Sequence, residues 1–214
     1  MTIQAGSDIW QSSLSTVFAS ALARAGEALA EMSGHAVSVD PADVRLCRAS
    51  EVIEAAGGPD AIVAGVYVGI TGSLHGHALL LLPPDGARRF AAILLEGIVE
   101  PGEALAGPDG DLALGPMEAS ALQELGNVTI SACLNELGAY FEEPVHPTVP
   151  QAIVELAGAI LDAVLLDLVA EVDQVLAART RFTIGGEAVD GTILILPDAP
   201  SLDALAGAVA SSSR

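Results

Sequence analysis

Ser120-Ala-Leu-Gln-Glu124-Leu-Gly-Asn127-Val-Thr-Ile-Ser131 is the stretch that decides how the chain folds, because its side chains separate into two faces at helical spacing. At about 100° per residue, one face holds Leu122, Leu125, Thr129, Ala132, Cys133 and, further on, Tyr140. The opposite face holds a narrow polar stripe of Ser120, Glu124, Asn127 and Ser131. The stretch predicts an amphipathic helix with this stripe in solvent.

Asn127 is the unusual member of the stripe. Asn is a mediocre residue inside a helix, because its amide competes for backbone hydrogen bonds. Glu124 lies three residues earlier, so the two side chains sit one above the other. A solvated polar face is the plain interpretation, since Glu and Asn are common at surfaces. An Asn in mid-helix beside a carboxylate nevertheless favours a functional interpretation.

The spacing Ser-x3-Glu-x2-Asn-x22-Pro, formed by Ser120, Glu124, Asn127 and Pro150, resembles the signature of the CheC/CheX/FliY chemotaxis phosphatases. The surrounding text looks most like CheC, and the similarity is close from about residue 113 to the end. It is looser but continuous before that. The supporting runs are Pro116-Met-Glu-Ala-Ser-Ala-Leu-Gln-Glu-Leu-Gly-Asn127, Ala157-Gly-Ala-Ile-Leu-Asp162 and Val189-Asp-Gly-Thr-Ile-Leu-Ile-Leu-Pro197-Asp198.

The resemblance implies an enzyme that hydrolyses the phospho-aspartate of a CheY-like response regulator. By this resemblance, Asn127 positions the hydrolytic water and Glu124 pairs with a Lys of the receiver domain. Ser120 and Ser131 line the docking surface, and Pro150 shapes the adjacent segment. Mg²⁺ comes with the receiver, so we expect no cofactor bound by this chain. The deamidase CheD is a possible further partner.

A non-catalytic interaction module is the alternative from another class. Such a protein is a CheD-binding adaptor or a flagellar switch component with a FliM-like fold. The intact pair of Glu124 and Asn127 favours the enzyme.

The composition restricts the kind of core, the partners and the cellular location that we expect. The 214 residues are 51% hydrophobic but only 3% aromatic, which predicts a largely aliphatic core. The net charge of −20, with eight Arg and no Lys, argues against nucleic acid and anionic membrane surfaces as partners. No apolar run approaches the roughly 20 residues of a membrane span, and the N-terminus has no secretory pattern. Cys47 and Cys133 read as buried thiols, so we expect a cytoplasmic protein.

The chain repeats one unit, with a first half at about 8–98, a connector at about 99–116 and a second half at about 117–212. Each half has a long helix, an extended segment, a short helix, two aliphatic strands and a last helix. We expect these at 8–32, 36–46, 50–56, 62–70, 76–83 and 87–97, then at 117–141, 145–156, 157–170, 175–184, 191–197 and 201–210.

Two such units usually share one sheet, because neither covers its own hydrophobic face. We therefore expect one α/β domain over residues 1–214, with two pseudo-symmetric halves, a common β-sheet and two long helices flanking it. The resemblance implies the same CheC-like fold. The connector, rich in Gly, Pro and Asp, joins the halves.

The first half lacks the functional residues. Matching Val37 with Val145 places Thr16 at the position of Glu124 and Ala19 at the position of Asn127. Neither residue carries a carboxylate or an amide. We therefore predict one active centre per chain, on the second long helix.

The remaining motifs are weaker indications of a functional site than the polar stripe. His75-Gly-His77 lacks further ligands at metal spacing, and Asp109-Gly-Asp111 lacks the rest of a calcium loop, so we expect no metal site. Cys133 lies on the core side, so a nucleophilic role is not expected. Gly185-Gly186 reads as a hairpin turn, and Ser201 as the N-cap of the last helix.

Overall fold

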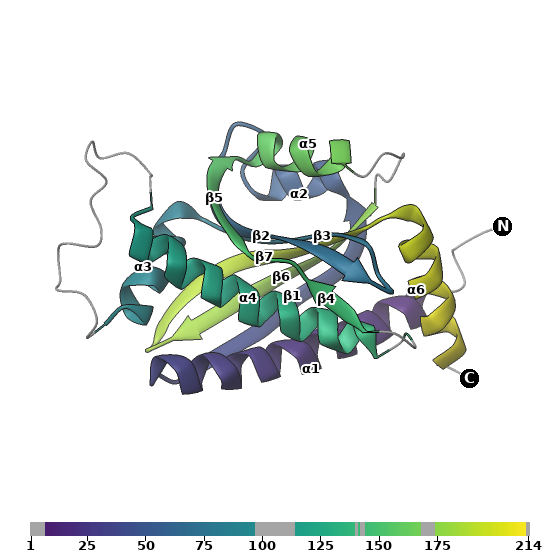
Figure 1. The fold of residues 1–214 in the computed structure, drawn as a ribbon, viewed down its shortest axis with the longest axis horizontal. Helices are drawn as coiled ribbons and strands as arrows, with labels where there is room; N and C mark the ends of the chain where they lie inside the picture. The colour runs from purple at the N-terminus through teal and green to yellow at the C-terminus, as the bar shows by residue number, and fades with distance from the viewer. Residues whose placement is uncertain (1–6, 97–113, 140, 142–143, 168–173, 213–214) are drawn as a thin grey trace.

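The computed structural model describes residues 7–96, 114–139, 141, 144–167 and 174–212 (Figure 1). The connector at 97–113, with Asp109 and Asp111, and residues 168–170 of the helix predicted at 157–170 lie outside the described residues. None of the described helices is both long and apolar enough to cross a membrane. In chain order the elements are α1 Ser7–Ser33, β1 Val37–Arg48, α2 Ala49–Ala55, β2 Ile62–Gly72, β3 Gly76–Leu82, α3 Pro84–Leu94, α4 Pro116–Gly138, β4 Val145–Pro147, β5 Gln151–Leu156, α5 Ala157–Asp167, β6 Gln174–Ile184, β7 Glu187–Pro197 and α6 Ala199–Ser212.

The seven strands form one antiparallel sheet to which both halves contribute. Its order is β1-β6-β7-β3-β2-β4, and β5 also pairs with β2. The hairpins β2–β3 and β6–β7 meet at the centre, where β3 pairs with β7. Each half then adds an outer strand to the other half's hairpin, since β1 pairs with β6 and β5 with β2. The predicted α/β fold, with two halves sharing one sheet, is confirmed.

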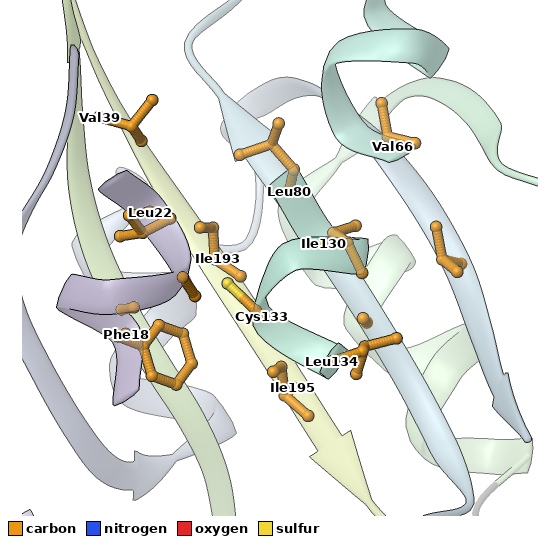
Figure 2. Close-up of a cluster of buried hydrophobic side chains, with 14 of the residues drawn as sticks. Phe18, Leu22, Val39, Val66, Leu80, Ile130, Cys133, Leu134, Ile193 and Ile195 are labelled. Atoms are coloured by element: carbon orange, nitrogen blue, oxygen red, sulfur yellow. The ribbon is translucent and has the colours of Figure 1, made fainter. Parts of the chain in front are cut away.

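The helices cover the two faces of the sheet unequally. The long helices α1 and α4 lie side by side on one face, and α2 and α5 lie over part of the other (Figure 1). Alternate residues of β3 serve the two layers: Leu80 packs toward α1 and α4, and Leu79 packs toward α2 and α5. Figure 2 shows the first layer, with Phe18 of α1 and Cys133 of α4 over Ile193 and Ile195 of β7.

Several boundaries differ from those predicted. β7 begins four residues before Gly191, and the extended segment at 145–156 is divided into β4 and β5. The turn at Gly185-Gly186 is as predicted, and both glycines have positive φ. Ser201 is not the N-cap of α6, because its own N–H donates to the Asp198 carboxylate at 2.9 Å and its hydroxyl accepts from His75 N–H at 2.9 Å.

Equivalent hydrogen bonds show how the two long helices correspond. Gln11 of α1 donates its side-chain amide to the Val44 carbonyl of β1. Gln123 of α4 donates in the same way to the Pro150 carbonyl, at 3.2 Å. Pro150 is therefore the counterpart of Val44. The predicted match of Val37 with Val145 would instead place Ala42 at this position, so the predicted register is wrong.

Two glycines fix the same correspondence at the other end of the helices. Gly26 lies against the start of β1, where an added Cβ would come 3.3 Å from the Val37 carbonyl oxygen and 3.5 Å from the Val39 nitrogen. Gly138 lies against β4, where a Cβ would come 3.7 Å from the Val145 nitrogen. Counting back five residues from the matched Val44 and Pro150 makes Val39, two residues beyond the predicted Val37, the counterpart of Val145, and the contacts of both glycines agree with this match.

The corrected register shifts the helices by one turn relative to the prediction. It matches Glu124 with Ser12 and Asn127 with Ser15, in place of Thr16 and Ala19. Neither serine carries a carboxylate or an amide, so the first half still lacks both functional groups.

Candidate functional site

Helix α4 begins with two local signals. Pro116 is its first residue, where a missing N–H costs nothing. Glu118 is buried, and its carboxylate accepts from the Gly115 N–H at 2.7 Å, which satisfies a backbone donor ahead of the helix. In mid-helix the buried Thr129 hydroxyl donates to the Leu125 carbonyl at 2.7 Å. The helix therefore runs unbroken through the residues of the predicted stripe.

The core side of α4 presses closely on the sheet. Leu122, Ile130 and Cys133 are fully buried. An added Cβ at Gly126 would come within 2.5 Å of Val66 on β2, so only a glycine allows this approach. Burial raises the pKa of the Cys133 thiol to about 12, so this thiol stays neutral and inert. The contact at Gly126 sets the height of the neighbouring Asn127 above the sheet.

The opposite side of α4 carries the predicted stripe at the surface. Ser120 and Glu124 are exposed, while Asn127 and Ser131 are half-buried. The Ser131 hydroxyl approaches the side-chain amide oxygen (Oδ1) of Asn127 at 3.5 Å, which is at the outer limit of a hydrogen bond. Within the described part of the chain, the Glu124 carboxylate makes no hydrogen bond or ion pair. Both chemically capable groups therefore face solvent without strong internal partners.

Pro150 is joined to this helix through its neighbour in the sequence signature. Its carbonyl accepts the hydrogen bond from Gln123, the residue immediately before Glu124. Asn127 lies one helical turn beyond Gln123 on the same side. The structure thus brings the four signature residues to one region, with Pro150 at the flank of the stripe rather than on it.

A pocket of about 730 Å³ lies elsewhere, between β2, β5 and α5. Its lining includes Tyr67 and His77, whose hydroxyl and Nδ1 are 2.8 Å apart, together with Gln151, Glu155 and Leu166. None of the stripe residues lines it. His77 of the His75-Gly-His77 motif is thus paired with a phenol, and no group of three His, Cys, Asp or Glu side chains in the described ranges is placed to hold a metal ion.

The stripe lies instead on the solvent-facing side of α4. Such a surface offers no cavity to enclose a small substrate.

Comparison with known proteins agrees with the sequence pattern. The chain is 26% identical over 144 residues to the CheY-P phosphatase CheC of Bacillus subtilis, which covers 66% of this chain and 64% of that protein. In fold, it matches FliY of Thermotoga maritima with a TM-score of 0.70 and 14% identity, over 94% of this chain and 96% of the other. The resemblance to the CheC/CheX/FliY family is confirmed. No family model matches the chain.

The same fold occurs in the FliM middle domain. The FliM middle domain of H. pylori matches with a TM-score of 0.63 and 10% identity, over 93% of this chain and 97% of that one. At such identities these two structures show a shared fold alone. The match to CheC spans just under two thirds of the length of that protein.

The sequence pattern did not point to three residues that shape this site: Gln123, Gly126 and Val149. Gln123 carries a signal only when the helices are matched in the corrected register, which places Gln11 at its position. Gly126 reads as an ordinary small residue until its contact with Val66 is seen. Val149 reads as a strand residue, whereas the structure leaves 80% of it exposed.

Proposed function

We propose that this protein is a phosphatase that hydrolyses the phospho-aspartate of a CheY-like response regulator in chemotaxis signalling. The observation that carries the proposal is the pair of Glu124 and Asn127, one turn apart on the exposed face of α4, with no strong partners within the described chain. The similarity to CheC, named as a CheY-P phosphatase, supports it.

The proposed reaction needs few catalytic groups from this protein. An acyl phosphate is already labile, and the resemblance implies that the receiver brings its own Mg²⁺ and Lys to the phosphoryl oxygens. What remains is to hold one water in line with the phosphorus–oxygen bond. The Asn127 amide suits this task, because its oxygen accepts from the water, its NH₂ donates to it, and it does not itself become phosphorylated.

Glu124 docks the receiver in this proposal. Its carboxylate, exposed one turn before Asn127, would pair with the receiver's Lys and fix the distance from the amide to the phosphorus. Ser120 and Ser131 border this pair on the same stripe. Pro150 acts indirectly, through the position of the segment that Gln123 holds against α4.

A second function comes from the flagellar likeness. The fold shared with the FliM middle domain, and with a chain of the FliG–FliM complex of H. pylori, suits a switch component or an adaptor that binds without catalysis. The two functions differ in one assay. Phosphate release from a phosphorylated CheY-like receiver should be faster with this protein than without it, and an unchanged rate would favour the non-catalytic module.

A further inference from the structure

The segment between β4 and β5 presents one apolar side chain to solvent. β4 ends at Pro147 and β5 begins at Gln151, and both strands pair with β2. Between them, Val149 has 80% of its surface exposed. A valine so exposed on a strand connection gains nothing from burial within the chain.

Both neighbours of Val149 are held in place. On one side, the Thr148 N–H donates to the Gly69 carbonyl at 2.8 Å, and the Gly69 N–H donates to the Thr148 hydroxyl at 2.8 Å. On the other side, the Pro150 carbonyl accepts from Gln123 of α4. Proline also restricts the backbone of the residue before it. Val149 is therefore a fixed projection rather than the tip of a loose loop.

The projection stands beside the stripe. Gly138 of α4 touches Val145 at the start of β4, and Gln123 reaches Pro150 just before β5. The chain from 145 to 150 thus runs alongside the helix turns between these two contacts, which are the turns that carry Asn127.

The first half has no apolar counterpart of the exposed Val149, just as it has no counterpart of the pair of Glu124 and Asn127. In the corrected register, Val44 corresponds to Pro150, so Asp43 corresponds to Val149. Asp43 is exposed and charged, and its carboxylate lies 3.5 Å from the Arg45 guanidinium. At this pair of matched positions, both within the described residues, the apolar side chain lies in the half that carries Glu124 and Asn127.

We propose that Val149 is an apolar docking contact for the phosphorylated receiver, adjacent to the ionic contact at Glu124, and that Gln123 is the positioning residue that holds it. This inference rests on the proposed function. A fixed apolar side chain at the edge of a polar site adds contact area at little cost in conformational entropy. It would secure a partner that Glu124 alone holds only weakly in water.

The test compares matched substitutions in steady-state dephosphorylation of a CheY-like receiver over a range of its concentrations. Val149→Asp introduces the residue of the first half and should raise KM at least tenfold while leaving kcat within twofold. Leu166→Asp is the control, since Leu166 is equally apolar, 81% exposed and far along on α5. It should leave both constants unchanged.

A second pair tests the positioning role. Gln123→Ala and Gln11→Ala each remove the same kind of side-chain to backbone hydrogen bond, so their effects on thermal stability should be alike. Only Gln123→Ala should raise KM, by about threefold to tenfold.

Binding of the receiver complexed with beryllofluoride separates this inference from the proposed function, because it needs no turnover. If the wild type binds but does not speed phosphate release, the phosphatase assignment fails while Val149→Asp still decides the docking contact. Equal affinity and KM for Val149→Asp and Leu166→Asp would overturn the inference. A wild type that neither binds nor hydrolyses would overturn both.

Discussion

Arg24 of α1 and Glu136 of α4 form an ion pair, with 2.6 Å between Nη1 and Oε1, at positions that correspond in the two halves. The pseudo-two-fold axis therefore passes between them and exchanges one for the other. At the centre of the sheet, Leu79 and Leu194 pair across β3 and β7 in the same way. The two halves therefore contact each other along this axis both in the helix layer, through α1 and α4, and in the sheet, through β3 and β7.

Exchange of the two charges should be tolerated because the positions are equivalent. Arg24→Glu alone places two carboxylates together and should lower the free energy of unfolding by about 1 kcal/mol. The double variant Arg24→Glu/Glu136→Arg should recover most of this loss. Urea denaturation at low salt measures it, and a double variant no more stable than the single one would refute the equivalence.

Gly126→Ala should destabilise the protein although alanine is the better helix former. The added methyl would overlap Val66, which costs about 1–3 kcal/mol and outweighs a helix-propensity gain of about 1 kcal/mol. Val66→Ala in the same chain should restore part of the loss. Gly207→Ala in α6, which meets nothing within 4 Å, is the control and should be neutral or stabilising in the same denaturation experiment.

The Cys133 thiol should be unreactive in the native protein. Burial raises its pKa to about 12, while the unfolded thiol ionises near its ordinary value, so its contribution to stability is present below about pH 9 and is lost as the pH rises toward 12. In a Cys47→Ser variant, a disulfide reagent at about pH 8 should label Cys133 only after denaturant is added. Rapid labelling without denaturant would contradict the buried position.

Glu124→Ala should weaken both receiver binding and turnover, because the docking carboxylate is lost. Since Glu124 is exposed, salt should screen the pair, and about 0.5 M salt should reproduce part of the loss in the wild type. Titration of the receiver at low and high salt measures this. An affinity that neither the substitution nor salt changes would remove Glu124 from docking.

The sequence predicts the helices, the hairpins and the polar stripe because each follows from a local period in which side chains face alternately in and out. The register between the halves does not follow from such periods. A shift of four residues in a helix, or of two in a strand, leaves the buried faces unchanged. The correction to the register differs between the helices and the strands. Gly26 and Gly138 correspond, but α1 continues from Gly26 to Ser33 whereas α4 ends at Gly138.

The exposed position of Val149 beside the stripe could not be predicted from the sequence for a related reason. The position of Val149 depends on hydrogen bonds to Gly69 and Gln123, both distant in the chain. A valine within an extended segment otherwise predicts a buried strand residue. Only the break between β4 and β5 turns it outward.

We propose that one active centre per chain, built on Asn127, speeds hydrolysis of the phospho-aspartate. In the corrected register the first half offers only Ser12 and Ser15. Stopped-flow decay of a phosphorylated CheY-like receiver with Asn127→Ala tests this most directly. We predict that the variant loses all acceleration, a fall of about 10²–10³-fold, while still binding the receiver. A variant that keeps half or more of the wild-type acceleration would contradict the claim.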